Sequence, residues 1–340
     1  MIKYLKDGFY YYFFHSVGLR GLFILSEDIR ICDAEVHFIR SIGKRIPDSY
    51  NTDWEWTKRL LLILDQENPL DSYSSMEDFL IQRNLVDFIV SFRPSESLPE
   101  KGRCYHFGDA YYGLNDSWEP FHYESWHSEY PGKPPYAYVH WKAPGQLEVL
   151  YLEDHSHMVS LSRQLFNIIG MESLFLDYKR FLLHSSLVDY KGKGILFSGA
   201  SGIGKSTQAK LWESHAKAEI LNGDVAGICK REDGYYAYGL PWAGSSGIYR
   251  NESVKISMIV MLSKGPDNIL EPMMAPMAVM NLYAQVLMHR FDPAFVDVAM
   301  GLIEEMVNKV QVYHFSCRPD KDAVMVVKEE LLRLSDSGAI

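Results

Sequence analysis

The sequence predicts an α/β protein with a mixed sheet and an N-terminal α+β accessory domain. In the second half of the chain, strand-like apolar runs such as 256–262 occur between segments with helical spacing such as 294–309. The segments 225–230 and 235–239 flank an Asp-Gly turn, which is typical of an antiparallel hairpin. Helices, strands and hairpins in this order favour a mixed sheet over a strict βαβ repeat.

Two domains are expected, over residues 1–98 and 99–340, and the chain is long enough for both. The boundary is expected there because 93–102 is polar and contains two prolines and a glycine. In the first domain, 54–64 and 76–90 have helical spacing, and no side chains there have catalytic spacing. The sequence therefore gives no role for residues 1–98.

Residues 103–160 are rich in aromatic side chains, and 136–141 and 147–152 alternate as strands do. Histidines are frequent in this stretch, but their spacing fits no helical H-x-x-x-H pattern. We therefore expect surface or hydrogen-bonded histidines on a β layer and not a metal site. The aromatic side chains are expected to pack in the core of a sheet and against its face.

The remaining elements are predicted from apolar periodicity and turn residues. Helices are expected over 160–170, which ends at a glycine cap, and over 173–183, 277–290, 294–309 and 322–334. Strands are expected over 187–190, 194–197, 218–224, 256–262 and 310–315. The first two of these strands are joined by a Lys-Gly-Lys turn and are expected to form a hairpin.

Composition limits the classes of partner. The formal net charge of −10 argues against a general nucleic-acid or anionic-membrane surface. The four cysteines lie far apart without a C-x-x-C pair, which favours reduced thiols in a cytoplasm. The N-terminus lacks the apolar core and cleavage site of a signal peptide, and no apolar run approaches the ~18 residues of a membrane span. We expect a cytoplasmic protein with no nucleic-acid or membrane partner, and the sequence leaves a homo-oligomer open.

The most specific motif is a phosphate-binding loop, G-x-x-x-x-G-K-[ST], over 199–206. An apolar strand precedes it and a helical segment follows it, as the motif requires. Its glycines can take positive φ and turn their N–H groups toward an anion, beside the positive end of the helix dipole. The expected nucleotide-binding residues are Gly199, Ala200, Ser201, Gly202, Ile203, Gly204, Lys205, Ser206 and Thr207.

Phosphoryl transfer depends on charge placement and on a group that handles the acceptor's proton. Lys205 can reach the β- and γ-phosphates of ATP, and the Ser206 hydroxyl can bind Mg²⁺. Asp224 ends the first strand after the loop helix, so we expect it near Ser206 as the acid of the site. Arg250 follows a Gly-Ser-Ser-Gly loop that could close over phosphate or acceptor, and a β-turn with a surface arginine is the alternative.

His184 lies fifteen residues before Gly199. A hairpin over 187–197 would carry it back toward the loop, and its reach depends on strand register. From the residues alone, a core or capping histidine is the more common role.

The run over 184–206 resembles the catalytic segment of the HPr kinase/phosphorylase family. That family has a similar His-Gly-x-Leu-Val-Asp stretch, a glycine turn, an apolar strand and Gly-x-Ser-Gly-x-Gly-Lys-Ser. The resemblance implies a nucleotide-binding core of the HPr kinase and phosphoenolpyruvate carboxykinase type. It implies that His184 is the active-site histidine and that Asp224 acts as base toward the acceptor hydroxyl.

The chain departs from that family at two positions of the matched segment and its surroundings. Gly223 stands where the family has a first, metal-associated aspartate, and Thr207 stands where it has an acidic residue. Asp224 would then serve metal and base roles together, or the metal would rest on Ser206 and phosphate oxygens. The family's later Glu-x-Arg-Gly-x-Gly signature has no counterpart that we can identify.

The leading hypothesis is an ATP-dependent kinase acting on a hydroxyl of a peptide, a protein or a small molecule. A nucleotide-driven ATPase or switch remains open, because Asp224 begins a D-x-x-G pattern, although no N-K-x-D guanine signature follows. A binding module with a degenerate catalytic half also remains open because of Gly223. Small-metabolite kinases share this loop but place it near the N-terminus, whereas here it lies past the midpoint.

Overall fold

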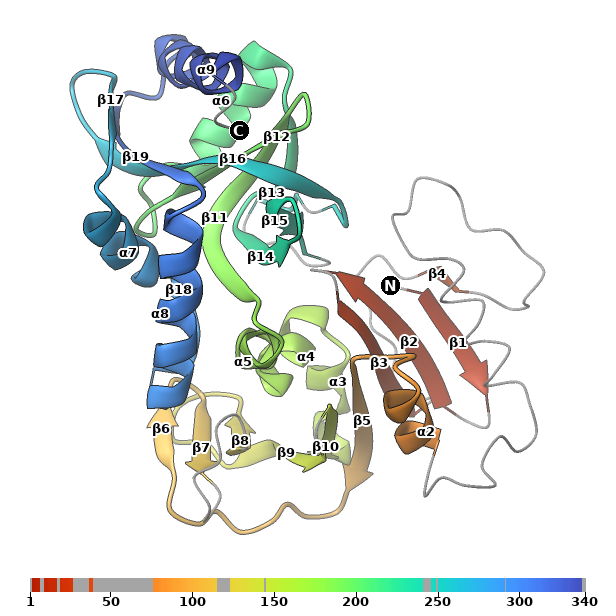
Figure 1. Cartoon of the computed structure of the whole chain (residues 1–340). Coiled ribbons are helices and arrows are strands. Elements are labelled where there is room, and N and C mark those ends of the chain that lie inside the picture. The colour runs from red at the N-terminus through yellow and green to blue at the C-terminus, as the bar shows by residue number, and fades with distance from the viewer. Residues whose placement is uncertain are drawn as a thin grey trace. The chain divides into compact units, whose positions relative to one another are not determined.

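The computed structural model describes residues 2–6, 9–16, 19–26, 37–38, 76–114, 123–143, 145–240, 246–248, 250–290 and 292–337. The fold is α/β, as the sequence predicted, and the structure contains two mixed sheets (Figure 1). The chain divides into two compact units, Met1–Met171 and Glu172–Ile340, which are described in turn.

The first unit is built on one sheet with strand order β4-β1-β2-β3-β5-β10-β9-β8-β7-β6. Its strands are β1 (Ile2–Lys6), β2 (Phe9–Ser16), β3 (Leu19–Ser26), β4 (His37–Phe38), β5 (Phe88–Ser95), β6 (Tyr105–Phe107), β7 (Ala110–Leu114), β8 (Tyr123–Ser128), β9 (Pro135–Ala143) and β10 (Gln146–Leu152). Its helical elements are α2 (Met76–Gln82), η1 (Glu153–His155), α3 (Ser156–Val159) and α4 (Ser162–Ile169).

The expected boundary after residue 98 lies inside this first unit. β5 pairs in parallel with β3 on one side and with β10 on the other, so strands from before and after residue 98 form one sheet. The first residues of the expected 93–102 linker therefore belong to β5, which is anchored by the buried side chains of Phe88, Ile89, Val90 and Phe92. The helix expected over 76–90 ends at Gln82, because the apolar run from Phe88 enters the sheet.

Other expectations for the first unit are confirmed. The two alternating segments are strands, as predicted, and the structure shows that β9 and β10 pair antiparallel. α4 ends at Gly170, which has φ 62° and caps the helix in the left-handed conformation. His127 is buried and hydrogen-bonded to Ser125, at 3.1 Å between its Nε2 and the hydroxyl oxygen. The predicted helix over 54–64 lies outside the described residues.

The second unit contains a mixed sheet with strand order β12-β11-β14-β15-β16-β19-β17, and β13 and β18 also pair with β11. Its strands are β11 (Phe181–Tyr190), β12 (Lys193–Ser198), β13 (Glu219–Asn222), β14 (Val225–Arg231), β15 (Gly234–Gly239), β16 (Ser253–Lys264), β17 (Ile269–Pro272), β18 (Val286–Leu287) and β19 (Gln311–Cys317). Its helices are α5 (Met171–Asp177), α6 (Lys205–Ala216), α7 (Ala275–Tyr283), α8 (Pro293–Val307) and α9 (Lys321–Asp336).

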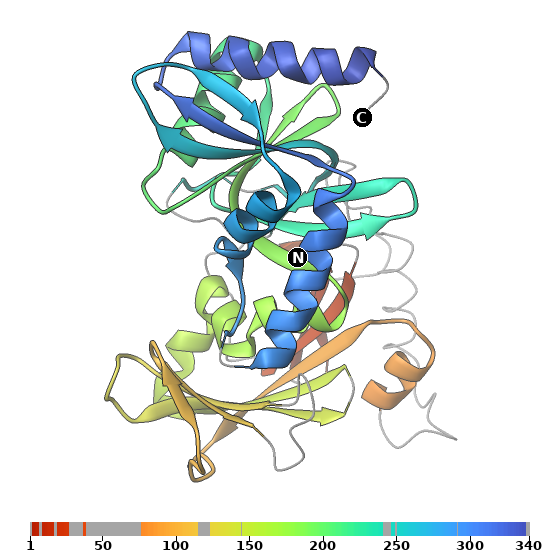
Figure 2. The ribbon, with the colours of Figure 1, turned by 60° about the vertical axis from the view of Figure 1, so that its left-hand side comes forward.

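The helices α6 and α9 lie together over one face of this sheet, as both views show (Figure 1, Figure 2). Trp212 of α6 is fully buried, and its ring contacts Phe197 of β12 and Tyr190 of β11. A buried tryptophan of this kind contributes roughly 3–5 kcal/mol when compared with alanine. This packing fixes the helix that follows the phosphate loop to the strand that precedes it.

The strands and helices predicted for this unit occur in the predicted order, together with β17 and β18, which were not predicted, and two of the helices are shorter than expected. The segment expected as a helix over 173–183 contains α5, which ends at Asp177, and the start of β11 at Phe181. Likewise α7 ends at Tyr283 and is followed by β18. Among the described residues, no helix is both long and apolar enough to cross a membrane.

Candidate active site

The candidate site is built on the hairpin formed by β11 and β12. β12 lies between β11, to which it is antiparallel, and β16, to which it is parallel. Its central residues Ile195, Leu196 and Phe197 are fully buried, because a central strand has helices or sheet on both faces. The phosphate loop leaves this rigid strand at its carboxyl end, where ligands of α/β sheets bind.

The loop glycines have the backbone conformation that the motif predicted. Gly199, Gly202 and Gly204 have φ of 138°, 75° and 120°. A Cβ atom at Gly202 or Gly204 would meet no heavy atom within 4 Å, so their conformation, and not crowding, requires glycine. No side chain caps the start of α6 at Gly204, so its first-turn N–H groups face the loop.

Lys205 turns its side chain back onto the loop. Its Nζ atom donates to the carbonyl oxygens of Gly199 at 3.0 Å and of Ala200 at 3.2 Å. The side chain is 6 % exposed, and burial lowers the pKa of this amine, while the nearby Asp224 carboxylate acts to raise it. Lys205 and Asp224 therefore share one electrostatic environment.

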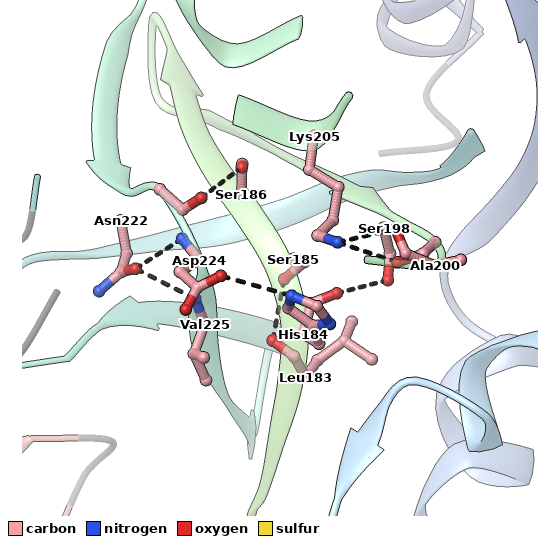
Figure 3. Close-up of polar contacts among 12 residues, drawn as sticks. Leu183, His184, Ser185, Ser186, Ser198, Ala200, Lys205, Asn222, Asp224 and Val225 are labelled. Atoms are coloured by element: carbon pink, nitrogen blue, oxygen red, sulfur yellow. Dashed lines mark hydrogen bonds and ion pairs between the residues drawn. The ribbon is translucent and has the colours of Figure 1, made fainter. Parts of the chain in front are cut away.

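His184 and Asp224 form a pair beside the loop (Figure 3). The His184 Nε2 atom lies 3.3 Å from Asp224 Oδ1. The register pairs Ser185 with Ser198, so His184 lies opposite the start of the loop. The Ser198 hydroxyl also donates to the His184 carbonyl at 2.8 Å, and the Ser185 N–H donates to the Asp224 carbonyl at 3.0 Å. The register that the sequence left open thus brings both residues to the loop.

Two neighbours that sequence analysis did not select hold Asp224 in place. The Asn222 side-chain oxygen accepts the N–H groups of Asp224 at 2.9 Å and Val225 at 3.1 Å, which is an Asx-type turn. The Ser186 hydroxyl donates to the Gly223 carbonyl at 2.8 Å. An Asn-Gly dipeptide is a local signal that favours a turn, whereas the Ser186 contact spans 37 residues and has no local signal in the sequence.

The β18 segment fixes the other side of His184. The His184 N–H donates to the Gln285 carbonyl at 2.9 Å, just before β18 pairs with Leu182 and Leu183. The histidine main chain is therefore held through both its N–H and its carbonyl, and its ring is positioned by the strand.

Arg250 is placed differently. Its Nη1 atom lies 2.8 Å from Glu219 Oε2, and both side chains are largely exposed. Its N–H donates to the Leu221 carbonyl, so the chain after the Gly-Ser-Ser-Gly loop runs beside β13. The structure thus does not bring Arg250 to the His184 and Asp224 pair. Residues 241–245 and 249 of that loop lie outside the described residues.

Gly223 is covered by Ser246 and Ile248. A Cβ atom at Gly223 would lie 2.1 Å from the Ser246 hydroxyl oxygen, and the Gly223 N–H donates to the Ile248 carbonyl at 3.3 Å. A larger side chain at position 223 would therefore displace Ser246.

The donor set fits Mg²⁺ better than a transition metal. Ser206 is exposed at the start of α6, and Asp224 is 38 % exposed, so both can offer oxygen atoms. The described residues contain no group of three or more His, Cys, Asp or Glu side chains that could hold a metal. Mg²⁺ commonly uses one or two protein oxygens together with substrate phosphates, and Ser206 and Asp224 fit that pattern.

No protein-family model and no curated protein sequence matches this chain. Among solved structures, the chain is similar to the Hpr(Ser) kinase/phosphatase from Coxiella burnetii, with a TM-score of 0.28 and 11 % sequence identity. That alignment covers 46 % of this chain and 96 % of the other. We therefore infer function from the geometry of the site.

Proposed function

We propose that this chain is an ATP-dependent kinase that transfers the γ-phosphate to a hydroxyl of a peptide, a protein or a small molecule. One observation carries the proposal. The His184 and Asp224 pair is tied by hydrogen bonds to the same strand end from which the phosphate loop begins. The loop leaves the β11–β12 hairpin, and Asp224 contacts the same hairpin through His184 and Ser185, which supports a phosphate site with a carboxylate beside it, as transfer to a hydroxyl requires.

The loop would bind the phosphates of ATP through its N–H groups and the start of α6. Lys205 would exchange its contacts with the Gly199 and Ala200 carbonyls for phosphate oxygens. Ser206 and Asp224 would hold Mg²⁺, which when bound would neutralise charge on the phosphate oxygens. Because Lys205 is buried, its charge would act there with little screening by water.

Asp224 would accept the proton of the acceptor hydroxyl as that oxygen attacks the γ-phosphorus. His184 would hold the carboxylate through the Nε2 to Oδ1 contact and stabilise its charge before transfer. Asn222 would keep the Asp224 main chain in its turn, so that the carboxylate keeps its direction.

The test is transfer of label from γ-labelled ATP with Mg²⁺ to an acceptor in cell extract. We expect a labelled acceptor with the wild-type chain and a loss of roughly 10²–10⁴-fold in Asp224→Asn. Glu213→Gln, an exposed carboxylate on α6, is the matched control and should label normally. Acceptor labelling that survives Asp224→Asn would exclude this residue as the base.

A regulatory ATPase is the second candidate, and Gly223 favours it. Position 223 is a glycine, so Asp224 has no carboxylate at the preceding position, and Ser246 occupies the space that a side chain there would need. In that case ATP hydrolysis should proceed at the same rate with and without extract, and no acceptor should be labelled. The same labelling experiment, with released phosphate measured in parallel, separates the two functions.

A further inference from the structure

A contact between two ionisable side chains, away from the phosphate loop, joins helix α5 to the segment that follows β18. The His289 Nε2 atom lies 3.3 Å from Glu172 Oε1. The His289 side chain is only 6 % exposed, and that of Glu172 is 24 % exposed, so water has little access to the contact. Burial of ionisable groups costs free energy. The proposed transfer reaction uses neither residue.

This environment favours the uncharged form of both groups. Burial raises the pKa of Glu172 to about 7 and lowers the pKa of His289 to about 4. Burial is the largest cause of both shifts, and no other charged side chain contributes to either. A glutamine at position 172 would therefore reproduce the uncharged carboxyl group.

The contact closes a ring of contacts around the main chain of His184. Helix α5 leads into β11, the strand that carries His184. The His184 N–H donates to the Gln285 carbonyl at 2.9 Å, and β18 then pairs with β11. Two residues after β18, the chain reaches His289 and its contact with Glu172 on α5. The partner of the His184 N–H is thus tied back to the helix from which β11 begins.

The strand β18 has two residues, so it depends on contacts beyond its own ladder. The Arg290 Nη2 atom donates to the Tyr283 carbonyl at 2.9 Å and to the Val286 carbonyl at 3.3 Å. Arg290 therefore holds the turn to its neighbours in the chain. His289 reaches a different element, α5, and so fixes the position of the turn relative to β11.

We propose that Glu172 and His289 are positioning residues for His184. They fix β18 relative to β11, and β18 fixes the His184 main chain, so that the imidazole keeps its contact with Asp224. They act through His184. This inference rests on the proposed function, because turnover is its first measurement.

The first test compares two substitutions at position 172. Glu172→Leu keeps the approximate volume and removes the polar group, and should lower turnover roughly tenfold with the affinity for ATP unchanged. Glu172→Gln should stay within about twofold of wild type, since its amide is uncharged and polar. A turnover in Glu172→Leu within twofold of wild type, or no recovery in Glu172→Gln, would contradict the proposal.

Glu330→Leu is the matched control. Glu330 is 19 % exposed, and it contacts Tyr313 of β19 and Arg333 of α9. Its replacement should lower the free energy of unfolding and leave turnover unchanged. A loss of turnover equal to that of Glu172→Leu would mean that destabilisation alone explains the effect.

A double-mutant cycle tests whether the pair acts through His184. In a His184→Ala background, Glu172→Leu should lower turnover by less than about twofold further, because the residue to be positioned is gone. A tenfold loss that persists in this background would overturn the proposal.

Amide hydrogen exchange tests the same ring without any activity. Exchange at the His184 N–H, which the Gln285 carbonyl accepts, should be at least about tenfold faster in Glu172→Leu and unchanged in Glu330→Leu. His289→Gln, the milder change at the other partner, should also accelerate it and serves if Glu172→Leu does not fold. Unchanged exchange would overturn the positioning role. A chain that labels no acceptor would overturn the proposed function, and exchange would still decide whether the pair holds the His184 main chain.

Discussion

The two ends of the short strand β13 carry two ion pairs with different surroundings. At its start, Glu219 pairs with Arg250 on the exposed surface. Just beyond its end, Asp224 pairs with His184 beside the phosphate loop. Glu219 also lies opposite Asp189, near the turn that joins β11 and β12, whereas Asn222 lies opposite Leu187, closer to the loop.

This difference indicates that the position of an ion pair in the sheet determines which other groups surround it. Both pairs join residues that are far apart in the sequence. One is placed at the carboxyl end of β12, where backbone N–H groups and a buried lysine converge. The other is screened by water on both sides, which limits its contribution to about 0–1 kcal/mol. The following substitutions test this contrast, from the largest expected effect to the smallest.

Lys205→Met should have the largest effect. Removing this buried cation, whose Nζ atom donates to the Gly199 and Ala200 carbonyls, should lower phosphate transfer by roughly 10²–10³-fold. The developing charge on the phosphate would then lose its nearest positive group. The turnover number and the affinity for ATP are the measurements. Lys210→Met, an exposed lysine on the same helix, is the control. A Lys205→Met chain within tenfold of wild type would contradict the role assigned to the loop.

His184→Ala should lower turnover by roughly 10–100-fold, which corresponds to the loss of one hydrogen bond to a charged group. Affinity for ATP should change little, because the ring contacts Asp224 and not the loop. His215→Ala, an exposed histidine near the end of α6, should behave as wild type. Loss of ATP affinity equal to the loss of turnover would indicate that His184 only supports the loop structure.

Gly223→Ala should destabilise the fold by about 1–3 kcal/mol, because its new methyl group would overlap the Ser246 side chain. The free energy of unfolding in urea is the measurement. The same substitution in a Ser246→Gly background should cost less, and the difference gives the coupling between the two positions. Equal costs in both backgrounds would show that Ser246 does not cover Gly223.

Arg250→Ala should have the smallest effect. Stability should change by less than about 1 kcal/mol, because both members of the ion pair are exposed. Phosphate transfer should stay within about threefold of wild type, since the wild-type guanidinium pairs with Glu219 away from the loop. Glu219→Ala should give the same result. A loss of activity of tenfold or more in Arg250→Ala alone would mean that Arg250 reaches the phosphates during the reaction.

Parts of the fold were predictable because they depend on local signals. The glycine spacing over 199–206 predicted the loop, and its positive φ values were confirmed at three positions. The hairpin of β11 and β12 and the Gly170 helix cap were also predicted correctly. Apolar runs at Phe88 and Phe181 were assigned to helices but form strands, because periodicity alone does not separate a buried strand from a buried helix.

The sequence by itself determined the backbone conformation of the loop over 199–206, because that conformation follows from the glycine positions and from the strand and helix on either side. Only the tertiary structure decided which side chains meet at that loop. His184 reaches Asp224 because the β11–β12 register pairs Ser185 with Ser198, and burial of the apolar strand residues fixes that register. Gln208 contacts Cys317, which lies 109 residues later, because parallel strands bring their carboxyl ends, and the segments that follow them, to one edge of the sheet.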